Sequence, residues 1–205
     1  MRVLIFSLGF LSFSLSLSAG LVSIDADAFA NGADMSNASA YATLSSVYGT
    51  SGLDGKVYAH TDILVSTGDK VFANNLSLSA EWLNKSSGGY ALRVDFLTPT
   101  DYVAIDFIGD GGLDYGTMDA YDSAGKWIDG DMAFLGTVGQ TYTAQVQRTD
   151  ADIAYIIAGG MGALDSTVHL DHLVFGIPEP VTCLLLSFGF LLLKPGKKKK
   201  THSAG

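Results

Sequence analysis

The sequence predicts an all-β fold: an antiparallel two-sheet β-sandwich of jelly-roll type, flanked by an N-terminal signal peptide and a C-terminal transmembrane helix. Apolar and polar residues alternate over 76–82 and 90–96, which is the pattern of strands with one wet face. Glycine- and aspartate-rich turn signals separate such segments. No amphipathic run of helical length interrupts them between residues 21 and 176.

Further strands are expected in the segments 41–48, 57–65, 102–108, 117–121, 141–148, 153–157 and 168–175. Turns are expected at 51–52, 54–55, 67–69, 86–89, 109–112, 123–125, 129–131 and 159–160. About nine short strands joined by turns are typical of a two-sheet sandwich. One domain over 21–176 is therefore expected, with about 70 per cent of its extended-chain surface buried.

Residues 1–20 have the organisation of a secretory signal peptide. Arg2 precedes an apolar, serine-interrupted run over 3–17, and three small residues, Ser18, Ala19 and Gly20, follow it. Small residues suit the positions before a cut by secretory signal peptidase. Cleavage is expected after Gly20, with Ser18 and Ala19 as alternatives, and the following domain is expected to be exported.

The predicted domain, 21–176, is strongly acidic. Of the 21 acidic residues of the chain only Glu179 lies outside it, and of the 12 basic residues six lie outside, which leaves 20 acids, 6 bases and a net charge of about −14. Phosphate contact needs a basic face, so nucleic acid is not an expected partner. Except for Glu81 all these acids are aspartates, which cap turns and bind hard cations. The one cysteine, Cys183, lies outside the domain, so no disulfide is expected in it.

The last 29 residues have three parts in a fixed order. The rigid step Pro178-Glu179-Pro180 stops a strand or helix that enters from either side. An apolar segment, 181–193, follows; counted from Ile177 it gives roughly 25 Å of helix against a hydrocarbon core of about 30 Å. A basic end at 194–200 with five lysines, before the short tail 201–205, is expected on the cytoplasmic side of the membrane.

This order of parts resembles the PEP-CTERM sorting signal of Gram-negative bacteria, which is processed by the membrane protease and transpeptidase exosortase. Pro178, Glu179 and Pro180 match the signature tripeptide, 181–193 the helix and 194–200 the basic end, which in the family is more often arginine-rich. The resemblance covers 177–200. It implies export through the inner membrane, a membrane-anchored precursor, cleavage near the tripeptide, and release or transfer of the domain to the cell surface. An ordinary single-span anchor is the alternative.

Three segments of the domain, 106–111, 118–126 and 169–175, are similar to the exported domains commonly found before such tails. Those domains are galactose-binding-like jelly rolls that resemble carbohydrate-binding modules. The resemblance implies a jelly roll and carries no catalytic signature. A catalytic function is not expected from the residues either, because the chain has no Gly-x-Ser-x-Gly, no His-Glu-x-x-His, no zinc-ligand spacing and no phosphate-binding loop. The pair His169 and His172 is interpreted as structural, because strand residues three apart point to different faces.

Calcium is the cofactor for which the sequence offers residues. Asp25 and Asp27 lie two apart in an N-terminal extended segment, and Asp171 lies in the last expected strand. First and last strands pair in many jelly rolls, which would bring the three carboxylates together, and calcium takes six to eight oxygen ligands. Asp110 and Asp114 form a second candidate pair. The alternative is that all these aspartates cap turns.

Sugar binding needs exposed aromatic side chains that stack on a pyranose ring. Tyr115 and Trp127 flank turns and are the candidates, whereas Trp82 and Tyr90 fall on apolar strand faces and are expected in the core. The sequence thus predicts an exported, non-enzymatic cell-surface or extracellular-matrix protein linked to exopolysaccharide or biofilm. The alternatives are a carbohydrate-binding module that recognises exopolysaccharide and, third, a glycan-active hydrolase.

Overall fold

A computed structural model describes residues 20–47, 55–74, 80–84, 90–161 and 166–177. The predicted signal peptide and the predicted sorting tail lie outside this range, except for Gly20 and Ile177. No helix within this range has both the length and the hydropathy needed to cross a bilayer.

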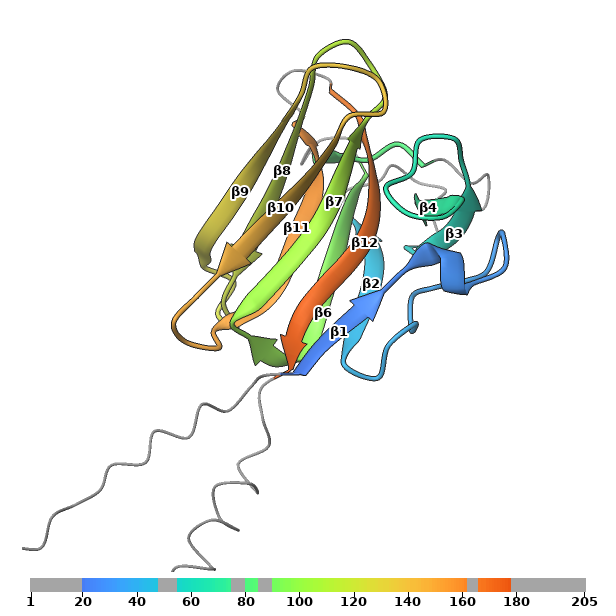
Figure 1. Cartoon of the computed structure of the whole chain (residues 1–205). Coiled ribbons are helices and arrows are strands. Elements are labelled where there is room, and N and C mark those ends of the chain that lie inside the picture. The colour runs from blue at the N-terminus through green and yellow to red at the C-terminus, as the bar shows by residue number, and fades with distance from the viewer. Residues whose placement is uncertain (1–19, 48–54, 75–79, 85–89, 162–165, 178–205) are drawn as a thin grey trace, which may run out of the picture. The chain divides into compact units, whose positions relative to one another are not determined.

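The described chain forms strands in two sheets, called sheet A and sheet B (Figure 1). Sheet A has the order β10-β7-β12-β4-β3, and β1 also pairs with β12. Its strands are β1 (Gly20–Ile24), β3 (Tyr58–Thr61), β4 (Lys70–Ala73), β7 (Tyr102–Gly109), β10 (Thr141–Gln147) and β12 (Val168–Ile177).

Sheet B has the order β2-β6-β11-β8-β9, and β5 also pairs with β11. Its strands are β2 (Ala42–Val47), β5 (Leu83–Asn84), β6 (Ala91–Thr100), β8 (Asp114–Tyr121), β9 (Trp127–Leu135) and β11 (Ile153–Met161). The short β5 runs parallel to β11, and the other strand pairs of both sheets are antiparallel. The predicted antiparallel β-sandwich is thereby confirmed.

The core lies between the two sheets and is made by alternate residues of their strands. Leu44, Val94 and Ile156 come from sheet B, and Phe107 and Leu170 face them from sheet A. The period-two alternation predicted over 90–96 is confirmed, because Leu92, Val94 and Phe96 are buried. The strand expected at 76–82 lies mostly outside the described residues.

Trp82 has no exposed surface, and its indole N–H donates a hydrogen bond of 2.9 Å to the Phe72 carbonyl. Tyr90 is half-buried and packs against the core. The expectation that both aromatic residues belong to the core is confirmed.

Two expected turns are wrong. Residues 129–131 lie inside β9, where Gly130 pairs with Asp119 of β8, and residues 159–160 lie inside β11. Gly160 is required because a Cβ there would collide with the backbone carbonyl oxygens of Trp82 and Ser166. Glycine in these strands thus marks close backbone approach instead of a turn.

The N-terminal segment also differs from its prediction. Asp25 does not continue an extended strand but is the N-cap of a short 3-10 helix, η1 (Ala26–Ala28), which contains Asp27. The strand expected at 57–65 ends at Thr61, and the unexpected β4 follows at Lys70. Because Val71, Phe72 and Ala73 are all buried, β4 has no alternation by which the sequence could reveal it.

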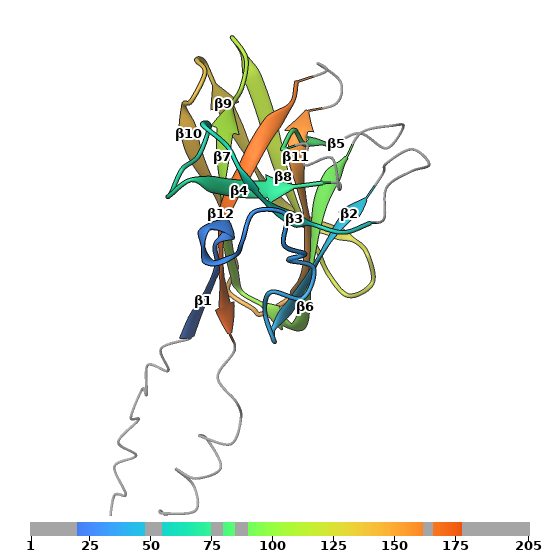
Figure 2. The ribbon, with the colours of Figure 1, turned by 90° about the vertical axis from the view of Figure 1, so that its right-hand side faces the viewer.

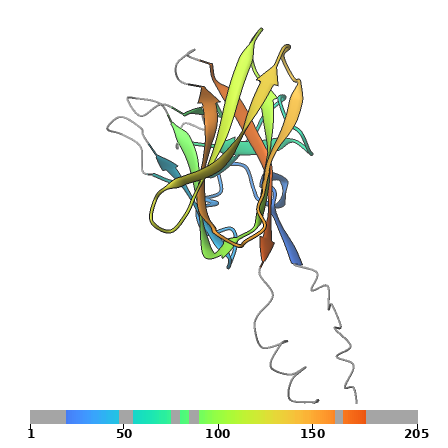
Figure 3. The ribbon, with the colours of Figure 1, turned by 90° about the vertical axis from the view of Figure 1, so that its left-hand side faces the viewer.

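The two sheets differ in what covers their outer faces. Segment 62–69, called the cover segment, links β3 to β4 on the outer side of sheet A. Its Leu64 and Val65 pack with Val71 of β4 and Ile108 of β7 in a small second apolar cluster. Figure 2 shows β3, β4 and η1 on this side of the molecule. Figure 3 shows the opposite edge of the sandwich, where β9 and β10 lie. On the outer face of sheet B, large side chains such as Trp127 and Phe134 of β9 are exposed.

Candidate functional site

Asp171 lies under the cover segment, on the outer side of β12, and has no exposed surface. Its Oδ2 accepts hydrogen bonds from the backbone N–H and hydroxyl groups of both Ser66 and Thr67, at 2.9 to 3.3 Å. Its Oδ1 accepts from the His172 N–H. Burial raises the pKa of Asp171, and these donors act in the opposite direction. The carboxylate therefore holds the cover segment on the sheet.

The other two predicted calcium ligands reach the same segment. Asp25 accepts the Asp27 N–H through Oδ1, and its Oδ2 lies 3.3 Å from the Thr67 hydroxyl that also contacts Asp171. Asp27 accepts the backbone N–H groups of Asp69 and Lys70, at 2.8 and 3.0 Å. The turn at 67–69 is confirmed; Gly68 has φ +46°, and a Cβ there would fall on the Asp27 carboxylate. Asp25, Asp27 and Asp171 thus converge on one turn.

This convergence matches the predicted placement, since β1 pairs with β12 and Ile24 lies opposite Leu173. The chemistry of the arrangement matches the alternative interpretation, because each of the three carboxylates already accepts N–H or O–H donors. Among the described residues, no group of three or more His, Cys, Asp or Glu side chains has a metal-binding arrangement. Calcium binding at Asp25, Asp27 and Asp171 stays a prediction.

The second aspartate pair also caps a turn. Asp114 accepts the N–H groups of Asp110 and Gly111 through Oδ2 and the Ser166 hydroxyl through Oδ1. Asp110 accepts the Thr167 hydroxyl at 2.9 Å, and burial raises the pKa of Asp110. These contacts join the 109–113 turn to the start of β12.

His169 and His172 do not point to different faces of the sheet, contrary to the prediction from the sequence. A register shift between Asp171 and Val174 puts a bulge into β12, and His172 takes a positive φ of 44°. Both imidazoles consequently meet carboxylates on the outer side of sheet A. His169 lies 3.6 Å from Asp62 and 3.7 Å from Asp110, and His172 lies 3.7 Å from Asp106. Because of the bulge, two residues three positions apart in β12 face the same side of the sheet.

The outer face of sheet B carries the exposed aromatic side chains. Trp127, Met132 and Phe134 on β9 are 55, 54 and 52 per cent exposed, which is unusual for large apolar residues on one strand. Tyr115 packs on Phe134 with ring centroids 5.1 Å apart, tilted by 55°. Tyr115 and Trp127 both lie on this face, as a sugar-binding role requires, but they stand at opposite ends of the β8–β9 pair.

Residues that the sequence argument did not single out fill the middle of this face. Tyr121 and Tyr155 stack with centroids 4.8 Å apart and an interplanar angle of 7°. The Arg93 guanidinium lies 3.8 Å from the centre of the Tyr155 ring and is held by Asp95 through two hydrogen bonds of 2.6 and 2.8 Å. The alternation of β6, β8 and β11 places them opposite the core, but their register was not readable from the sequence.

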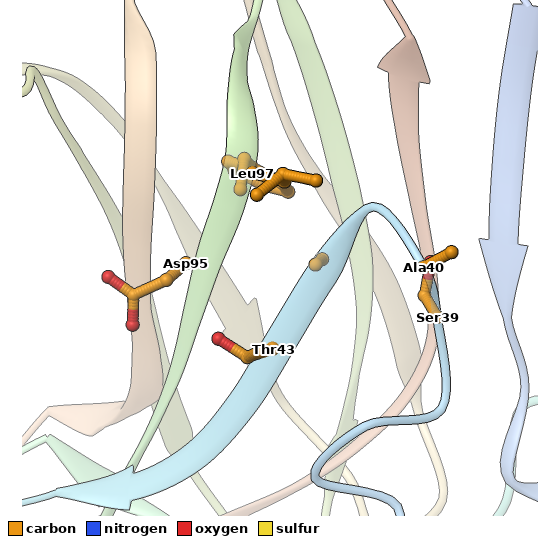
Figure 4. A pocket seen from close by; sticks show the side chains of 7 residues that line it. Ser39, Ala40, Thr43, Asp95 and Leu97 are labelled. Carbon is orange, nitrogen blue, oxygen red and sulfur yellow. The ribbon is translucent and has the colours of Figure 1, made fainter.

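Beyond Asp95 the face opens into a hollow of about 310 Å³ between β2 and β6 (Figure 4). Its lining residues are Ser39, Ala40, Ala42, Thr43, Asp95, Phe96 and Leu97. A second hollow of about 160 Å³ adjoins it and shares Leu97, whose side chain is 77 per cent exposed. Hydroxyl, carboxylate and apolar groups therefore meet at this edge of sheet B.

No protein-family model matches the chain, and no curated protein matches it. Among solved structures, the chain is similar to the K2 cleaved adhesin domain of Lys-gingipain, with a TM-score of 0.48 and 11 per cent identity over 77 per cent of this chain and all of that domain. A likeness this weak carries no statement about function.

Proposed function

We propose that the chain is the precursor of an exported, non-enzymatic cell-surface or extracellular-matrix protein, linked to exopolysaccharide or biofilm and sorted through a PEP-CTERM signal. The order of Pro178-Glu179-Pro180, the apolar segment 181–193 and the lysine-rich end carries the sorting proposal. In the proposed sorting route, signal peptidase removes residues 1–20 and exosortase acts near the tripeptide. The domain then reaches the outside of a Gram-negative cell.

The jelly-roll type of the sandwich is part of the proposal, and the strand order supports it. Numbered from β4 and leaving out the short β5, eight strands run to β12. Sheet A places them in the order sixth, third, eighth, first, and sheet B in the order second, seventh, fourth, fifth. Successive strands thus cross repeatedly between the sheets, as in a double Greek key.

Substitutions in the tripeptide test the sorting. Glu179→Ala or Pro180→Ala should leave export intact but let the full-length, membrane-bound precursor accumulate, because the rigid step at the membrane face is lost. Membrane fractionation and blotting of the producing cells measures the ratio of precursor to processed protein. Thr182→Ala, two residues beyond the motif, is the matched control. Equal processing of all four proteins would favour a plain membrane anchor.

A second candidate function, carbohydrate binding, is favoured by one observation, the exposure of Trp127 and its neighbours Met132 and Phe134 on the outer face of sheet B. A rigid aromatic ring offers a large contact area to the apolar side of a sugar. A glycan-binding screen with residues Gly20–Pro178, which form one compact unit, tests this candidate. Absence of binding to every glycan in the screen would leave the structural or adhesive surface role as the proposal.

A further inference from the structure

We infer that the outer face of sheet B binds an uncharged polysaccharide laid across its strands, from Trp127 on β9 to the hollow around Thr43 on β2. The inference rests on the second candidate function above and assigns its site and the charge class of its ligand.

The residues of this site lie in one row across the sheet. Trp127 is opposite Tyr121, Tyr121 is opposite Tyr155, Tyr155 is opposite Asp95, and Asp95 is opposite Thr43. With neighbouring strands about 4.8 Å apart, four steps give a row of roughly 19 Å. This length accommodates several sugar units of an extended chain.

The row is rigid before any ligand arrives. The Trp127 indole N–H donates to Asp119 at 3.1 Å, which fixes the ring, and the Tyr121–Tyr155 stack is closed by Arg93. Because the two tyrosine rings face each other, they offer their edges to a ligand, while Trp127 offers an exposed ring surface. Side chains that are already ordered lose little conformational entropy on binding.

The end of the row at β2 offers both apolar and hydrogen-bonding groups, which match the two kinds of surface on a sugar. Leu97 supplies apolar surface at the hollow, and Ser39, Thr43 and Asp95 supply hydroxyl and carboxylate groups (Figure 4). Pyranose rings combine apolar C–H faces with hydroxyl edges, so both kinds of group find partners. A few placed polar groups in an otherwise apolar lining are typical of ligand sites.

The charges on the row select against an anionic polymer. Arg93 is already paired with Asp95, and Asp119 adds a further carboxylate beside Trp127. The segment 21–176 as a whole has a net charge of about −14, from 20 acids and 6 bases. A uronate or sulfate polymer would meet repulsion, whereas an uncharged chain would not.

Pairing of a second copy along β9 is disfavoured at this edge. The backbone N–H groups of Gly130 and Met132 donate to the side chains of Asp129 and Asp131. An incoming strand would have to displace these bonds, and carboxylates on an edge strand oppose strand addition. The exposed side-chain face of sheet B is therefore left as the binding surface.

Native affinity electrophoresis tests the inference on the full chain in detergent and on residues Gly20–Pro178. The probes are four neutral polymers, hydroxyethyl cellulose, galactomannan, xyloglucan and dextran, with the anionic polymer alginate for comparison. At least one neutral polymer should retard the protein, and alginate should not. Trp127→Ala, which removes the stacking surface, and Thr43→Trp, which fills the hollow, should each weaken binding about ten-fold or more.

Phe134→Ala is the matched control, since Phe134 is equally exposed on the same strand but lies off the row. Trp127→Phe, which keeps a ring, should retain most of the binding if Trp127→Ala fails to fold. Neutral binding that both row variants leave unchanged would overturn this site while carbohydrate binding stands. Retardation by alginate alone would overturn the charge class, and no retardation by any polymer would overturn both the site and the carbohydrate candidate.

Discussion

Aspartate and ring side chains lie on the outer faces of both sheets, but they are buried on sheet A and reach solvent on sheet B. On sheet A, the cover segment buries Asp171 and His169, which are 0 and 6 per cent exposed. On sheet B, Trp127 and Asp119 point outward, Trp127 is 55 per cent exposed, and Asp119 holds the indole in place. An aspartate under the cover segment ties chain segments together, whereas one on sheet B orients a side chain that faces solvent.

This difference shows that strand alternation predicts the direction of a side chain but not its exposure to solvent. A polar residue at every second position shows that a side chain points away from the core, and it does not show that the side chain meets water. What decides between the two is a chain segment from elsewhere, here the cover segment, whose Ser66 and Thr67 lie 105 and 104 positions before Asp171. Stability is therefore expected to depend on the aspartates of sheet A, and ligand binding on sheet B.

The largest effect is expected from Asp171→Ala. Removal of this carboxylate leaves the half-buried Ser66, Thr67 and His172 donors without their acceptor. The free energy of unfolding should fall by about 3 to 5 kcal/mol. Asp119→Ala on sheet B is the comparison and should change it by less than about 1 kcal/mol. Urea unfolding followed by circular dichroism measures both, and equal losses would contradict the division between the two faces.

Calcium gives the next effect in size. A divalent ion bound by the folded state at Asp25, Asp27 and Asp171 would offset their mutual repulsion and join η1 to β12. At one hundred times Kd it would stabilise the fold by roughly 2.7 kcal/mol, a rise on the order of 5 to 10 °C in Tm. Magnesium should do less, because it keeps its waters and requires a tighter octahedron.

Thermal unfolding in chelator and in millimolar calcium checks this prediction. Asp171→Asn should abolish the shift, and Asp119→Asn should preserve it. If the melting curves of the wild-type protein coincide, or if Asp171→Asn still responds, the three aspartates act as turn caps only.

The sequence allowed the fold class and part of the aspartate cluster to be predicted, because both depend on local pattern. Alternation located the strand at 90–96, and strand-forming segments bounded by turn signals located those at 41–48 and 102–108. The pairing of first and last strands brought Asp25 towards Asp171. The turn at 67–69 was predicted, but the contacts of Ser66 and Thr67 with Asp171 were not, because nothing local to a turn shows which distant side chain it will meet.

The row on sheet B was less accessible for a different reason. The segment 129–131 has the composition of a turn, and its place inside β9 depends on pairing with β8, which overrides local propensity. The alignment of Trp127 with Tyr121 further depends on a register shift after Ala120. A bulge of one residue exchanges the two faces of a strand, so exposure on either side of it cannot be counted from the sequence.

The smallest effect concerns a surface aspartate whose titration opposes that of Asp171. A hydrogen bond from Lys56, supported by the Ser36 N–H, lowers the pKa of Asp34 to about 2. A lowered pKa means that the unfolded chain binds the proton first, so the contribution of Asp34 is complete above its ordinary value of 3.8 and is lost as the pH falls towards 2. Burial raises the pKa of Asp171, so the stability that comes with its neutral form is instead lost as the pH rises through the folded-state pKa.

Comparison of Asp34→Asn with the wild-type protein should therefore show a difference of only a few tenths of a kcal/mol at pH 7, because the pair is largely exposed and screened by solvent. The difference should vanish between about pH 4 and pH 2. Urea unfolding midpoints of both proteins, measured across this pH range, test the prediction. A difference that persists at pH 2 would mean that Asp34 stabilises the fold through its turn contact with Ser36 alone, independent of its charge.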